Sequence, residues 1–146
     1  MTNEPNSNVN IKLISTIRPI EGDSEIYEMW LEGSYIEKAN STYLRYEEIQ
    51  NEQVIRTTLK LGNDQALIMR GGGVNMRLPL NIIEQQVGHY ESEFGSMPLM
   101  TRTHALNFNR KPDMKSGEFS VQYDLIIGGQ SVGNYKLDIQ FTEVLA

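Results

Sequence analysis

Apolar and polar residues alternate along most of the chain, from Val9 to Glu143, in short runs that Gly, Asn or Asp interrupt. Successive side chains on a β-strand point to opposite faces of the sheet, so a period of two is typical of strands with one buried face. The pattern therefore predicts an all-β protein made of antiparallel strands. The expected strands are Val9–Ile17, Ile26–Glu37, Thr42–Glu48, Val54–Leu61, Ala66–Arg70, Val74–Leu80, Val87–Phe94, Met97–Phe108, Gly117–Ile127 and Val132–Val144.

Strands with one apolar face can bury those faces together in a sandwich or in a closed barrel. Long strands near both ends of the chain contain glycine, which lets a strand bend sharply at a barrel corner. We therefore expect a closed or nearly closed antiparallel β-barrel of about eight to ten strands, wide enough to hold one small ligand. Residues 1–8 are polar and are expected to form a flexible tail, and residues 9–146 a single barrel domain. Asn81 could cap one helical turn.

The dipeptide Gly95-Ser96 is the first of two turns that fix a strand register. A two-residue loop with glycine first suits a type II′ turn. It pairs Tyr90 with Thr101 on the apolar face and His89 with Arg102 on the polar face. Because the charged residues then share one side of the hairpin, the register agrees with the alternation.

The second turn is Gly128-Gly129-Gln130. A two-residue loop at the glycines would mix the two faces, because it sets Tyr123 opposite Asn134. A three-residue loop pairs Tyr123 with Tyr135 and keeps apolar residues together. We therefore predict the three-residue loop with a glycine bulge.

Composition and charge exclude several classes of function. The net charge of −6 and the pI of about 4.9 argue against nucleic acid or an anionic membrane as a partner, since both require a basic surface. The absence of cysteine excludes disulfides, thiolate chemistry and cysteine-bound metals. The first residues lack the features of a signal peptide, and no apolar run reaches the ~18 residues of a membrane helix. We expect a cytoplasmic protein.

The segment MRGGGVNMRL, followed by HYESEFGSMPLMTRT, resembles the YwiB-like family of uncharacterised bacterial proteins. The resemblance extends from about Val9 to Phe141 and departs at Ser92, where threonine is expected and a hydroxyl is retained. It implies a small barrel of the lipocalin or calycin type and no activity, because none is assigned to the family. The motifs that carry it are Arg70-x-Gly72, Tyr90-x-Ser92-x-Phe94-Gly95 and Leu99-x-Thr101-x-Thr103.

Several tyrosines and two threonines fall on the expected inner face of the barrel. Buried hydroxyls need hydrogen-bond partners, so they could orient a bound ligand or satisfy one another in a filled core. Arg70 would need a carboxylate or a ligand anion if it points inward, and is an ordinary surface residue if it points outward. The candidate ligand-binding residues are Tyr35, Arg70, Tyr90, Thr101, Thr103, Tyr123 and Tyr135.

Other candidate chemistry has simpler explanations. His89, Glu91 and Glu93 share a face and could bind a divalent metal, but Arg102 beside them would repel a cation, so a solvated surface is favoured. The glycines of Gly71-Gly72-Gly73 could form an anion nest, but a tight turn or bulge is favoured because no helix follows. We expect neither a metal site nor a cofactor. No catalytic residues can be assigned, which favours a non-enzymatic protein without deciding the question.

Two functional hypotheses follow. The first is a barrel that binds a small, mostly apolar molecule in its interior. The alternative is a protein-interaction or assembly module with a filled core, whose outer surface around Trp30, with Ile26 and Ile36, contacts a partner or a second copy in a homodimer. An internal cavity would separate the two hypotheses, because only the first requires one.

Overall fold

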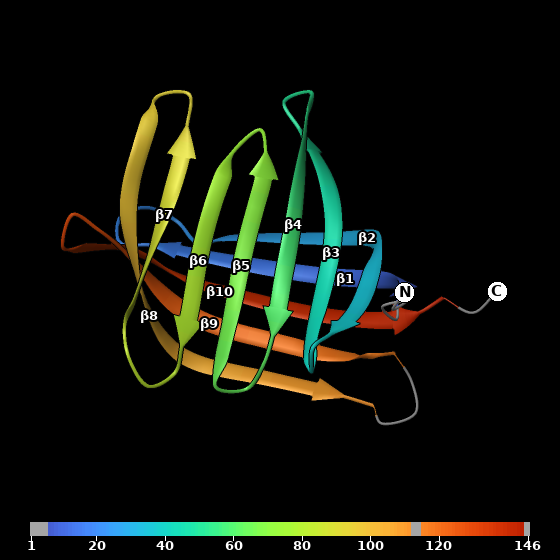
Figure 1. The fold of residues 1–146 in the computed structure, drawn as a ribbon. Coiled ribbons are helices and arrows are strands. Elements are labelled where there is room, and N and C mark those ends of the chain that lie inside the picture. The colour runs from blue at the N-terminus through green and yellow to red at the C-terminus, as the bar shows by residue number, and fades with distance from the viewer. Residues whose placement is uncertain (1–5, 112–114, 145–146) are drawn as a thin grey trace.

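The computed structural model describes residues 6–111 and 115–144, which form a closed barrel of ten antiparallel strands (Figure 1). The predicted fold class is confirmed, and every expected strand is present. β1 begins at Asn6, within the expected tail. In order around the barrel the strands are β1 (Asn6–Pro19), β10 (Gln130–Glu143), β9 (Gly117–Ile127), β8 (Gly95–Arg110), β7 (Gln86–Ser92), β6 (Asn75–Asn81), β5 (Gln65–Gly72), β4 (Gln53–Leu61), β3 (Ser41–Gln50) and β2 (Glu25–Lys38).

The strands form two crossing layers (Figure 1). β3 to β7 run across β1, β9 and β10, and the curved strands β2 and β8 pass from one layer into the other. The layers cross because β2 pairs with β1 through residues 25–36 but with β3 only through residues 33–38. A similar corner occurs where β8 passes from β7 to β9.

Gly33 is the corner residue of β2. A Cβ at this position would lie 2.5 Å from the backbone oxygen of Arg45 and 2.7 Å from Cδ1 of Ile11. Only glycine allows the neighbouring backbone to approach this closely, which agrees with the glycine corner expected from the sequence.

The corner of β8 contains a β-bulge at His104. Thr103 pairs with Tyr123 and Ala105 with Gln122, so His104 is the extra residue. A bulge increases the local twist of a strand and so helps it turn between the layers.

The predicted register of the β7–β8 hairpin is wrong. The loop is Glu93-Phe94 rather than Gly95-Ser96, and Tyr90 lies opposite Met97 rather than Thr101. His89 consequently pairs with Pro98, so Arg102 is not beside it. The hydroxyl oxygen of Ser92 accepts a hydrogen bond from the backbone N–H of Phe94 at 3.2 Å, which stabilises the observed turn.

The shift covers an even number of residues, so the inner and outer faces of the hairpin are as predicted. Phe94 continues the alternation of Tyr90 and Ser92, which would place it on the inner face, but it occupies the loop and is 92% exposed.

The predicted pairing of the β9–β10 hairpin is confirmed. Tyr123 lies opposite Tyr135, and Leu125 lies opposite Gly133. The predicted three-residue loop is wrong, because Ile127 pairs with Gln130 and the tight loop is Gly128-Gly129. The one extra residue of β10 lies in a bulge between Ser131 and Gly133. Beyond this bulge the strand pairs are the predicted ones.

At residue 81 the structure has a side-chain cap without a helix. Oδ1 of Asn81 accepts hydrogen bonds from the backbone N–H groups of Ile83, at 2.8 Å, and Glu84, at 3.4 Å. β7 then begins at Gln86. No helix long or apolar enough to cross a membrane occurs in the part of the chain that the structure describes.

The core fills one half of the barrel interior more completely than the other. Val9, Ile11, Leu13 and Tyr35 are buried, as the alternation along β1 and β2 requires. Ile17, Met29 and Leu31 face inward but stay partly exposed, and Tyr27 is half exposed. The other buried apolar residues of the core cluster are Leu44, Tyr46, Leu59, Leu61, Ala66, Ile68, Leu78, Leu80, Leu99, Leu106, Phe119, Val121, Tyr123, Ile139 and Phe141.

Candidate functional site

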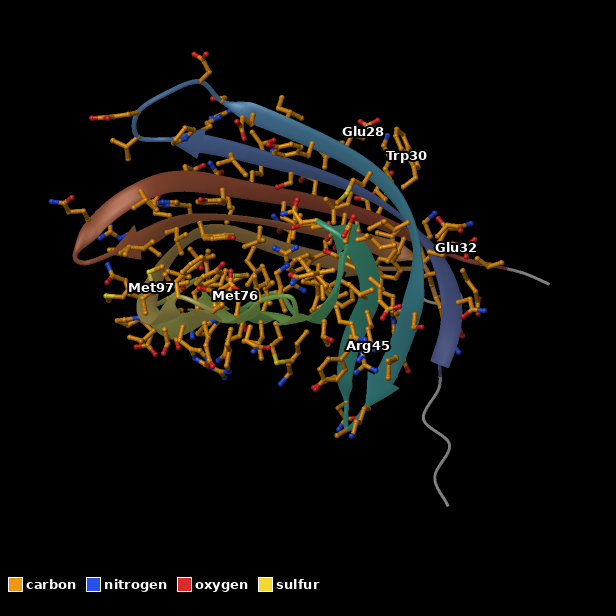
Figure 2. All side chains as sticks on the ribbon, turned by 90° about the horizontal axis from the view of Figure 1, so that it is seen from above. Glu28, Trp30, Glu32, Arg45, Met76 and Met97 are labelled. Carbon is orange, nitrogen blue, oxygen red and sulfur yellow. The ribbon has the colours of Figure 1, made fainter. Side chains whose placement is uncertain are left out.

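One part of the inner surface has side chains that pack against the core and are still reached by solvent. We call this surface the open half of the barrel. It lies beneath the first part of β2 and beside the loops β3–β4, β5–β6 and β7–β8, and Figure 2 views the barrel from this side. The partly exposed apolar side chains that define it are Met29, Leu31, Met76, Tyr90, Leu125, Ile127 and Tyr135.

Arg70 lies in the open half, which answers the question that its sequence context left undecided. On β5 it shares a face with the buried residues Ala66 and Ile68, so it points inward. Its Nη2 lies 3.5 Å from Oε1 of Glu48 on β3, and 27% of the Arg70 side chain is exposed. The guanidinium therefore has the carboxylate partner that an inward arginine requires and is still accessible.

Two buried tyrosines flank this ion pair. Burial raises the pKa of Tyr46 to about 12; the Glu48 carboxylate adds to the shift, while Arg70 opposes it. Burial also raises the pKa of Tyr123, as does Tyr135, and Arg70 again opposes the shift. Both phenols are therefore neutral at physiological pH and can donate hydrogen bonds.

Tyr123 and Tyr135 face each other across β9 and β10. Their rings stack with centroids 5.5 Å apart and an interplanar angle of 11°. Tyr90 lies between Met76 and Met97 in a cross-strand row on β6, β7 and β8. The open half therefore combines flat aromatic rings with flexible thioethers, a composition suited to apolar ligands of varied shape.

Two buried threonine hydroxyls lie beside the ion pair and the tyrosines. Thr57 on β4 is directly opposite Tyr46, and a hydrogen bond with its hydroxyl lowers the pKa of that phenol. Thr103 on β8 is directly opposite Tyr123, and its Oγ1 has no hydrogen-bond partner among the described residues. Because buried polar groups are nearly always hydrogen-bonded, the unsatisfied hydroxyl of Thr103 is an uncommon feature.

Two predicted site residues do not join this cluster, because their hydroxyls have structural partners. Oγ1 of Thr101 donates a 2.6 Å hydrogen bond to the backbone oxygen of Pro79, joining β8 to β6. Tyr35 stacks on Phe141 and donates its hydroxyl proton to Glu37, and it accepts a hydrogen bond from Arg110. The structure thus brings together Arg70, Tyr90, Thr103, Tyr123 and Tyr135.

Sequence reasoning missed three members of the cluster: Tyr46, Glu48 and Thr57. The signal was present, since Tyr46 and Glu48 share their face with Leu44 on β3. Thr57 lies on the same face of β4 as Ile55 and Leu59. These residues could have been found by extending the period-two analysis to the middle strands.

The outer surface holds a second polar network, on β8, β9 and β10. Nε2 of His104 lies 2.8 Å from Oδ2 of Asp124, and Nδ2 of Asn134 donates to Oδ1 of Asp124 at 3.0 Å. Burial raises the pKa of Asp124, but the hydrogen bonds from Asn134 and His104 outweigh this effect and lower the pKa below 3.8. Within the described residues no group of three or more His, Cys, Asp or Glu side chains could hold a metal ion.

The sequence predicts an outer surface on β2 around Trp30, Ile26 and Ile36, and the structure differs at one of these three residues. Trp30 is 68% exposed, Ile26 is similarly exposed, and Nζ of Lys12 lies 5.9 Å from the centre of the Trp30 ring. Ile36 is buried, so the exposed apolar row consists of Ile26 and Trp30.

The comparisons with known proteins agree with this architecture. A family model described as "Domain of unknown function (DUF1934)" matches residues 11–139. The chain belongs to this family. It is 26% identical over 121 residues to the uncharacterized beta-barrel protein YwiB of Bacillus subtilis (strain 168), an alignment that covers 83% of this chain and 84% of YwiB.

The crystal structure of the ywiB protein from Bacillus subtilis has the same fold. It superposes with a TM-score of 0.83 at 24% sequence identity, covering 96% of this chain and 94% of that chain. The resemblance to the YwiB-like family is thereby confirmed, and with it the small barrel, whereas the description of the family carries no activity.

Proposed function

We propose that the open half of the barrel binds a small, mostly apolar molecule that carries one polar or singly anionic group. The observation that carries the proposal is the unsatisfied hydroxyl of Thr103 on the same inner surface as the accessible guanidinium of Arg70, a surface that is otherwise mostly apolar. Ligand sites in proteins typically combine an apolar lining with a few converging polar groups. Calycin-like barrels, whose fold the family resemblance suggested, commonly use their interiors in this way, and this analogy supports the proposal only at the level of fold.

The polar groups define what the ligand must offer. The Arg70 guanidinium is balanced by Glu48, so the pair is neutral overall and favours at most one negative charge on a ligand. The neutral phenols of Tyr46 and Tyr123 lie close enough to Arg70 for its charge to affect their pKa values. A carboxylate, sulfonate or hydroxyl group placed among them would receive hydrogen bonds and would also give the Thr103 hydroxyl a partner.

The apolar groups define the remainder of the ligand. Met29, Met76 and Tyr90 contact the core and remain partly exposed. Covering such surface stabilises a complex by about 25 cal/mol per Å² of apolar area removed from water. A ligand with an aromatic or aliphatic body would therefore lie along the methionines and direct its polar group toward Arg70.

The test uses 1-anilinonaphthalene-8-sulfonate, an apolar probe with one negative charge, in a fluorescence titration. Met76→Trp fills the open half and should weaken probe binding at least tenfold. Arg77→Trp adds the same side chain to the exposed outer face of the same strand and should change binding less than twofold. Equal binding by the wild type and Met76→Trp would overturn the proposal.

Native mass spectrometry of freshly purified protein complements the titration. We expect a co-purified small molecule whose occupancy falls in Met76→Trp and is retained in Arg77→Trp. A bound mass that both variants retain equally would place the ligand elsewhere on the protein.

A further inference from the structure

One edge of β2 has no neighbouring strand along residues 25–32. These residues pair with β1 on one side, whereas β3 joins β2 only from Gly33 onward. The far end of β3, residues 47–50, pairs only with β4. Among the described residues no backbone hydrogen bond crosses between the two diverging edges. A wedge-shaped gap therefore opens at the corner of the barrel, and Figure 2 shows β2 along its rim, bending toward β3.

The sequence of this edge protects it only against acidic strands. Exposed strand edges usually carry charged side chains, lysine above all, or proline or a bulge, which prevent another strand from adding to the sheet. Residues 25–32 read EIYEMWLE, whose charges are all negative, with no proline and no bulge in the pairing to β1. Ile26 and Trp30 are exposed on the outer face, and Figure 2 shows Trp30 pointing away from the barrel. The edge therefore presents free backbone groups together with apolar side chains.

The charged side chains on the outer face of the edge itself are negative. Glu28 and Glu32 alternate with Ile26 and Trp30 there and form no ion pair among the described residues. Toward β3, Glu32 and Glu47 share a hollow with Arg45 and Arg56, and Glu47 lies 2.8 Å from Arg56. The two unpaired glutamates call for a partner with positive charges.

We propose that residues 25–32 of β2 bind an extended segment of a partner protein, which adds to the sheet as an extra strand. Its outward side chains would alternate basic and apolar, so that cations face Glu28 and Glu32 and apolar groups cover Ile26 and Trp30. Main-chain hydrogen bonds supply affinity in this mode of recognition, and the side-chain pattern supplies specificity.

A second copy of this chain fits the edge less well. Each copy carries a net charge of −6, and two antiparallel β2 edges would place the glutamates of both copies on one face. The partner segment therefore has the opposite charge. Its site uses the edge and outer face of β2, whereas Met29 and Leu31 on the inner face of the same residues belong to the proposed small-molecule site.

The test is a fluorescence anisotropy titration with labelled peptides. KTVTKTVT matches the outer-face pattern, because its lysines and valines alternate on one side of an extended strand. Lys38 and Ser41 are the hydrogen-bonded pair of a two-residue turn, so the even residues of β2 direct their backbone groups toward the free edge, and an added antiparallel strand would bond through its lysines and valines. KTVTKTVT that is N-methylated on both valines and on its second lysine keeps the charge but loses the N–H groups that would point toward β2, and ETVTETVT reverses the charge. We expect both control peptides to bind at least tenfold more weakly than KTVTKTVT.

Matched variants of the protein locate the site. The double substitution Glu28→Lys and Glu32→Lys should weaken KTVTKTVT binding at least tenfold. Glu91→Lys with Glu118→Lys makes the same charge change on exposed positions of β7 and β9 and should change binding less than twofold. Hydrogen exchange in residues 25–32 should slow when the peptide binds.

Equal binding of KTVTKTVT and its N-methylated form would overturn the proposal, because it would show attraction by charge alone. Equal loss in the two double variants would overturn it too, as would a homodimer through β2 in sedimentation velocity. Met76→Trp should retain peptide binding, so failure at the β2 edge and failure in the barrel interior are distinguishable.

Discussion

Two threonines on β8 allow a direct test of the unsatisfied hydroxyl. Thr101 and Thr103 are both buried, point into the barrel and lie two residues apart. Thr101 donates a 2.6 Å hydrogen bond to Pro79, whereas Oγ1 of Thr103 has no partner among the described residues. Valine has nearly the same shape as threonine, so Thr→Val removes the hydroxyl and changes little else.

The same substitution should therefore have opposite effects at the two positions. A buried polar group without a partner costs about 1–3 kcal/mol, so Thr103→Val should raise the free energy of unfolding by about 1 kcal/mol. Thr101→Val leaves the Pro79 carbonyl unpaired and should lower it by about 1–2 kcal/mol. For a chain of this size, 1 kcal/mol corresponds to a change of about 3 °C in Tm.

Urea unfolding monitored by circular dichroism measures both variants against the wild type. The m-values should be unchanged, so that the shifts in midpoint report stability directly. Thr103→Val should also weaken binding of the anilinonaphthalene probe, because it removes a ligand contact. If Thr103→Val destabilises the protein as much as Thr101→Val does, the hydroxyl has a partner and the reasoning fails.

Three further predictions concern the framework of the barrel. Gly33→Ala should destabilise the protein by about 2–3 kcal/mol in urea unfolding, because its Cβ would lie 2.5 Å from a backbone oxygen; an unchanged midpoint would contradict the close corner. Tyr35→Phe removes the hydroxyl bonded to Glu37 and should cost about 1–2 kcal/mol by the same assay, and no loss would show that this contact adds nothing. The pKa of Asp124 is lowered from 3.8, so its carboxylate stabilises the fold above that pH and this stability is lost as the pH falls through the lowered value. Asp124→Asn should therefore flatten the acid side of a plot of Tm against pH, and an acid side as steep as that of the wild type would refute this.

The alternation of apolar and polar residues was sufficient to predict the strands and their faces. Gly117–Ile127 has the predicted bounds, and Phe119 and Val121 point inward as their positions require. The period of two carries this information because a strand with one buried face must repeat it along its length.

The registers were less predictable, because shifting a hairpin by an even number of residues preserves both faces. The β7–β8 pairing depends on the turn itself, where the Ser92 side chain stabilises a loop at Glu93-Phe94. The β9–β10 pairing was predictable because only an odd insertion keeps Tyr123 and Tyr135 on one face.

The candidate site was predicted only in part, for a related reason. Alternation places Tyr35 and Tyr90 on the same inner face, but it does not show that one lies in the filled half and the other in the open half. The ion pair between Arg70 and Glu48 joins β5 and β3 across β4, so it depends on two strand registers together rather than on the alternation within one strand.

The methionines provide the most direct measurement of the central claim, that the open half of the barrel binds a small apolar ligand. Met29, Met76 and Met97 point into this half, whereas Met69 and Met100 lie on the outer face of β5 and β8. Titration of anilinonaphthalene sulfonate into protein labelled with ¹³C at the methionine methyl groups should shift the three inner signals and leave the two outer ones in place. Shifts confined to Met69 and Met100, or equal small shifts of all five signals, would contradict the claim.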